Sequence, residues 1–144
     1  MAIANCKDEC ETLMSAVLPL AEQMLSEHGT LRPFGSTLST SDQVVDIGSA
    51  SHGLVQDEAS LLAEYRDSFR EGAQRGELKA TALVYAASSI APGAAKPEWT
   101  VAVQLDHRDD YSIVVNFPYR FTETGELVID EPFASEGEHK IFDR

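Results

Sequence analysis

Two stretches of alternating apolar and polar residues, separated by one polar turn, occupy residues 99–121. In the first stretch, one face carries Trp99, Val101, Val103 and Leu105. In the second, one face carries Tyr111, Ile113, Val115, Phe117, Tyr119 and Phe121. Because successive side chains of a strand point to opposite faces, this period predicts an antiparallel hairpin whose two arms both pack on a core.

Two other segments have the three- and four-residue spacing of amphipathic helices. The first covers residues 5–28, where Pro19 predicts a kink or a split because proline removes one helical hydrogen bond. The second covers residues 57–75 and has an apolar face made of Leu61, Leu62, Tyr65 and Phe69. We expect this face to pack on the side of the sheet that carries Val101, Val103, Ile113 and Val115.

The remaining strands complete an α+β fold. Residues 30–38 and 43–47 predict a first hairpin, residues 127–129 a short last strand, and residues from about 131 an irregular acidic C-terminal segment. The nearly continuous apolar run at 82–87 indicates a central strand covered on both sides. We therefore predict one domain over residues 1–144, with an antiparallel sheet of five to six strands, two helices on one face and the order α-β-β-α-β-β-β. This arrangement is similar to that of roadblock and longin-like modules, which are mainly dimerisation and docking units.

Charge and composition narrow the classes of partner. The chain has 24 acidic and 11 basic residues and a formal net charge of −13, which is the wrong sign for binding nucleic acid or an anionic membrane surface. No run approaches the roughly 20 apolar residues of a membrane span, and the N-terminus lacks the pattern of a secretory signal. Cys6 and Cys10 lie one helical turn apart, which favours reduced packing thiols. We expect a cytoplasmic protein without a cofactor.

A polar cluster follows the first arm of the long hairpin and contains Asp106, His107, Asp109 and Asp110. Three carboxylates and an imidazole are groups that a divalent cation or acid–base chemistry uses. The cluster falls at the expected hairpin tip, however, where Asp residues bond to their own backbone. We therefore predict a solvated turn, and no metal site, because no set of four ligands is visible.

A proline interrupts the second arm of the hairpin. Pro118 lacks a ladder donor, which confines it to a strand edge or bulge. The residues around it are interface candidates, since Tyr and Arg are enriched where proteins bind one another: Phe117, Tyr119, Arg120 and Phe121. The alternative is a strand end where proline only blocks edge pairing. A similar element at residues 31–35 is expected to lie beside it.

Catalytic signatures are not found: the chain contains no G-x-S-x-G, no Gly-rich phosphate loop and no H-E-x-x-H. The leading hypothesis is a non-enzymatic module that binds another protein or itself as a homodimer. One alternative is a hydrolase or isomerase that uses His52 or His107 with a nearby carboxylate. Another is an antitoxin-like inhibitor whose acidic segment, residues 123–143, neutralises a basic partner.

Several short motifs carry a family resemblance over about residues 5–142. They are Leu31-Arg32-Pro33-Phe34-Gly35, Val44 to Gly48, Ala82 to Ala86, Val101 to His107 and Pro118-Tyr119-Arg120. In these the chain resembles a family of small uncharacterised bacterial proteins. The resemblance implies a bacterial origin and brings no catalytic or binding residues with it.

Overall fold

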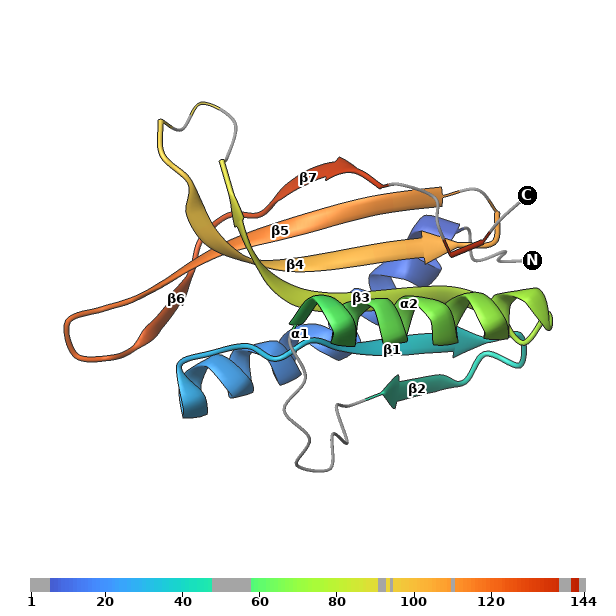
Figure 1. Cartoon of the computed structure of the whole chain (residues 1–144). Coiled ribbons are helices and arrows are strands. Elements are labelled where there is room, and N and C mark those ends of the chain that lie inside the picture. Colours follow the sequence, from blue (N-terminus) through green and yellow to red (C-terminus); the bar gives the residue numbers. More distant parts are fainter. Residues whose placement is uncertain are drawn as a thin grey trace.

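The computed structural model describes residues 6–47, 58–90, 93, 95–109, 111–137 and 141–142. Two helices and seven strands form the fold (Figure 1). In chain order they are α1 (Cys6–His28), β1 (Phe34–Ser39), β2 (Val44–Ile47), α2 (Glu58–Gln74), β3 (Leu78–Ser89), β4 (Glu98–His107), β5 (Tyr111–Phe121), β6 (Leu127–Ile129) and β7 (Phe133–Glu136).

All strands belong to one antiparallel sheet with the order β2-β1-β3-β4-β5-β6, and β7 also pairs with β5. The α+β class and the order of elements are therefore confirmed, with one strand more than the largest number expected. The segment after about residue 131, for which irregular structure was expected, contains the additional strand β7. It pairs with residues 113–116 of β5 and so covers part of the outer edge of that strand.

The two helices lie on opposite faces of the sheet, α2 in front and α1 behind in Figure 1. Alternate residues of β3 show this division, because Ala82 and Val84 pack with α1 whereas Leu83 packs with α2. The expectation that both helices share one face is wrong. Val101 and Val103, which we assigned to the second helix, belong to the core under α1. The apolar run of β3 has to be buried on both faces of the sheet, and each helix covers one of these faces.

Helix α1 continues through Pro19 without splitting and buries one stripe against the sheet: Cys10, Leu13, Val17, Ala21 and Leu25. It ends at His28, and the next residue, Gly29, has a positive φ of 71° that is favourable for glycine; its N–H donates to the carbonyl of Leu25 at 2.9 Å. Among the described residues, no helix is long and apolar enough to cross a membrane.

Helix α2 approaches β1 very closely. Phe69 is buried, and a Cβ atom at residue 35 would lie 2.6 Å from its Cζ atom and 2.8 Å from the carbonyl oxygen of Ala82. Gly35 is therefore required by space rather than by backbone conformation. Ile141, near the C-terminus, joins Leu61 and Tyr65 in the same core cluster.

Candidate functional site: an aromatic hollow between diverging strands

Strands β4 and β5 separate at one end of the sheet. Their last pair is Thr100 with Pro118, and beyond it the end of β5 pairs only with β6. The start of β4 stays with β3, where Glu98 is opposite Ser89. Figure 1 shows the β3–β4 end and the β5–β6 hairpin extending in different directions. The divergence leaves a space on the face of the sheet that α1 covers.

Pro118 lies where the outer partner of β5 changes from β7 to β6, since β7 pairs with residues 113–116 and β6 with residues 119–121. The carbonyl of Pro118 accepts a 2.8 Å hydrogen bond from the N–H of Asp130. Both backbone polar groups of a strand residue point toward the same edge, so the missing donor of Pro118 faces β6 and not β4. The prediction that this proline marks an interruption of the ladder is confirmed.

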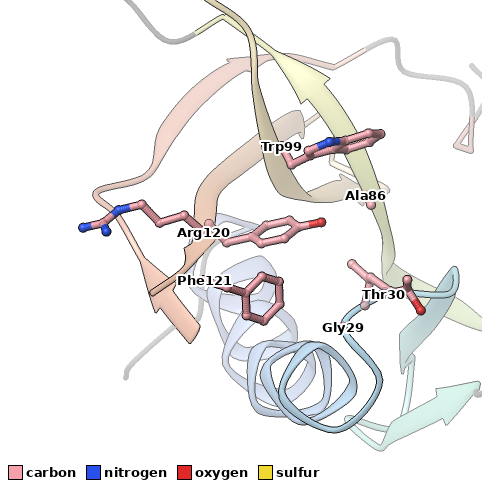
Figure 2. Close-up of a pocket in the computed structure, with 8 residues that line it drawn as sticks. Gly29, Thr30, Ala86, Trp99, Arg120 and Phe121 are labelled. Atoms are coloured by element: carbon pink, nitrogen blue, oxygen red, sulfur yellow. The ribbon is translucent and has the colours of Figure 1, made fainter. Parts of the chain in front are cut away.

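A hollow of about 500 Å³ occupies the space between the diverging strands. We call it the aromatic hollow, and its lining residues are Gly29, Thr30, Leu31, Ala86, Trp99, Tyr119, Arg120 and Phe121. The first two follow the end of α1, which closes one side of the hollow (Figure 2). The volume lies within the range of about 300–1,000 Å³ that is typical of ligand pockets.

Three aromatic side chains line the hollow, and strand periodicity explains why. Tyr119 and Phe121 continue the face of Phe117, and Trp99 continues the face of Val101, which is opposite Phe117. Tyr119 and Phe121 are in edge contact, with ring centroids 6.2 Å apart and planes at 81°. Trp99 is 59% exposed although it is among the largest apolar side chains. Figure 2 shows the Trp99 and Phe121 rings on two sides of the space.

The four interface candidates do not occupy equivalent positions. Tyr119 and Phe121 line the hollow, whereas Phe117 is only 8% exposed and belongs to the core under α1. Phe117 therefore contributes to folding and not to a surface. The Arg120 guanidinium points away from the aromatic rings (Figure 2), and its Nε atom lies 3.6 Å from Oδ2 of Asp130.

Sequence reasoning found part of this lining and missed the rest. Leu31 and Tyr119 both line the hollow, in agreement with the expectation that the two similar proline-containing elements are neighbours. Trp99 was assigned to the buried face of the hairpin and is instead exposed. The position of Trp99 was the available signal for its exposure. Trp99 is the residue immediately outside the Thr100–Pro118 pair, at which the pairing of β4 with β5 ends.

The polar cluster is not a solvated turn as a whole. Asp106 and His107 are the last two residues of β4, and both are buried. Asp109 is exposed beyond the strand, while Asp110 lies outside the described residues. Ser112 donates a 2.7 Å hydrogen bond to Oδ1 of Asp106 across the β4–β5 ladder. The prediction was wrong for these two residues. His107 faces α1, where Glu9 contacts it, whereas Asp106 points to the opposite face of the sheet and bonds to Ser112.

His107 joins α1 to β4 through Glu9. Its Nδ1 atom accepts the N–H of Asp109 at 3.0 Å, so Nε2 carries the proton that it donates to Oε1 of Glu9 at 2.7 Å. Lys79 donates to the other Glu9 oxygen at 3.2 Å and also bonds to Asp42. Burial raises the pKa of Glu9, but the hydrogen bonds from His107 and Lys79 outweigh it and hold the pKa below the ordinary value. The bonds to Asp42 and Glu9 raise the pKa of Lys79.

This network joins α1, β3 and β4, the elements that carry Glu9, Lys79 and His107. The His107 side chain is 1% exposed, so a substrate has no direct access to its imidazole. His52, the other histidine considered for catalysis, lies outside the described residues. Within the described part of the chain, no three His, Cys, Asp or Glu side chains come together as a metal site. The aromatic hollow is consequently the better candidate for function.

No family model, curated protein or solved structure matches this chain. The resemblance to a bacterial family therefore stays an expectation, and the site is interpreted from its own geometry.

Proposed function

We propose that this chain is a protein-binding module whose recognition surface is the aromatic hollow. The observation that carries the proposal is the exposed Trp99 across the hollow from the Tyr119–Phe121 pair, where two strands diverge. Aromatic residues, above all Trp and Tyr, dominate the few positions that supply most of the binding energy at protein interfaces. Rings held on strands also lose little conformational freedom when a partner binds.

The surroundings of the hollow support binding more than catalysis. Among the described residues, its lining contains no carboxylate, histidine, cysteine or lysine that could transfer a proton or attack a substrate. The one ionisable lining side chain with a permanent charge, Arg120, points away from the rings. A surface of apolar rings with a polar rim is typical of an interface core.

Panning a library of random dodecapeptides on the immobilised full chain tests this proposal. Selected peptides should bind the wild type in calorimetry, and Trp99→Ala should weaken their binding by about 30-fold or more, the effect of an interface hot spot. Val45→Ala is a matched control, because Val45 is exposed on β2, at the opposite edge of the sheet, and should change nothing. Peptides that bind the Trp99→Ala protein as tightly as the wild type would contradict the proposal.

Self-association through the same surface stays a prediction. A stable homodimer would pair the hollow with its symmetry copy and bury about 1,200 Å² or more in total. Sedimentation of the wild type beside a Tyr119→Glu variant tests this. A wild type that is monomeric at high micromolar concentration excludes the homodimer and leaves a different protein as the partner.

A further inference from the structure

We infer that the aromatic hollow receives a lysine or arginine side chain from a basic partner protein, an inference that rests on the proposed function. The faces of aromatic rings carry partial negative charge and attract cations, with Trp the strongest of the three ring types. The hollow presents Trp99, Tyr119 and Phe121 around one space. Aromatic ring faces would also accept an apolar group, so a preference for a cation depends on the charges and dipoles around the rings.

The end of α1 supplies the first independent argument. Gly29 and Thr30, which follow the last helical residue, line the hollow. The carbonyl groups in the last turn of a helix lack helical partners and give that end partial negative charge. A 23-residue helix therefore presents its negative end to the same space as the rings. Both features favour a positive group and disfavour a carboxylate or phosphate.

The charges beside the hollow supply the second argument. The β5–β6 hairpin and the residues that follow it, 120–131, contain four acidic residues and one basic residue, Arg120. That arginine lies near Asp130, which offsets its charge. The nearby Arg32 interacts electrostatically with Tyr65, a residue of the α2 face on the opposite side of the sheet. The acidic excess of this segment, like the net charge of −13, therefore favours a basic partner.

The lining also explains why a protein side chain fits better than a free metal ion. None of the described lining residues carries a carboxylate, so a hard cation would find no oxygen anions there to replace its water. A lysine or arginine side chain instead has an apolar stem that can contact Leu31 and Ala86 while its charged end meets the rings. The volume of about 500 Å³ leaves room for the residues on either side of it.

A peptide array tests this inference with the full chain. Each hexapeptide occurs in three forms, with lysine, norleucine or glutamate at one central position and the same flanking residues. We expect the lysine form to bind about 2-fold to 30-fold more tightly than the norleucine form, the range of a cation–π contact from exposed to desolvated. Calorimetry gives the dissociation constants, and the fluorescence of Trp99, the sole tryptophan, reports whether the peptide occupies the hollow.

Two further measurements separate charge from packing. Arg120→Gln removes the one basic residue of the β5–β6 region and should increase the affinity for lysine peptides more than the affinity for norleucine peptides. The preference for lysine should decrease between about 0.01 M and about 1 M salt, since the Debye length falls from about 30 Å to about 3 Å. Val45→Ala should leave every affinity unchanged.

The outcomes distinguish this inference from the proposed function. If norleucine or glutamate peptides bind as tightly as lysine peptides, the cationic side chain is refuted and protein binding stands. If no peptide binds the wild type more tightly than a Trp99→Ala/Phe121→Ala variant, both fail. If sedimentation shows a wild-type dimer that this double variant dissociates, the hollow is occupied by a second copy, and the basic partner is refuted.

Discussion

Removing the carboxylate of Glu9 should destabilise the fold by an amount that depends on its hydrogen bond with the buried His107. The Nε2 donor of His107 is buried, and Oε1 of Glu9 at 2.7 Å is its acceptor. In Glu9→Ala that donor loses its partner, which costs about 1–3 kcal/mol for a buried polar group. Because Glu9 is 13% exposed, water can reach part of the vacated space, and we expect about 2 kcal/mol. For 144 residues this lowers the melting temperature by about 6–7 °C.

Glu9→Gln provides the sharper comparison. Its amide oxygen can still accept from His107, and only the ionic bond from Lys79 is lost, so Glu9→Gln should cost less than Glu9→Ala. Thermal unfolding followed by circular dichroism should therefore rank the wild type above Glu9→Gln, and Glu9→Ala last. Glu11→Ala, exposed on the same helix, is the control and should stay within about 0.5 kcal/mol of the wild type. If Glu9→Ala and Glu11→Ala melt together, the His107 bond does not stabilise the fold.

Other predictions concern the α2 face and pH. Phe69→Ala should cost about 3–5 kcal/mol in chemical denaturation, because the ring is buried; an unchanged midpoint would contradict its place in the core. Gly35→Ala should cost about 1–3 kcal/mol, since the added methyl meets Phe69, and a neutral effect would contradict the close approach. The stability that Glu9 contributes is present above pH 4.5 and is lost as the pH falls through its lowered pKa, so wild type and Glu9→Gln should converge in acid. The contribution of Lys79 should be lost in the opposite direction, as the pH rises through its raised pKa above 10.5.

The main helices and strands could be predicted from the sequence because their side-chain periodicity lies within short segments of the chain. The period of residues 99–121 predicted β4 and β5, and the helical spacings predicted α1 and α2. Which sheet face each helix covers depends on contacts between distant segments. An apolar stripe on α2 is compatible with either face, and the distinction lies in β3, where Ala82 and Leu83 point in opposite directions.

The polar cluster shows the same limit at a single site. Asp and His residues after a strand are typical of a solvated turn, and Asp109 is indeed exposed. His107 is buried because Glu9, 98 residues earlier in the chain, is brought against it. No local pattern contains that pairing. The gap in strand pairing on the outer edge of β5 at Pro118 was predictable, by contrast, because a missing backbone donor is a property of one residue.

The exposure of Trp99 is difficult to explain by folding alone. The register of Thr100 with Pro118 would place Trp99 opposite Tyr119 if the ladder continued by one pair. That pair would bring two aromatic rings together across the strands, an arrangement that stabilises a sheet by about 0.2–1 kcal/mol. Pro118 does not prevent it, because its missing donor faces β6. The strands diverge instead and leave both rings on the wall of a hollow, which is a cost to the free chain that a bound partner would repay.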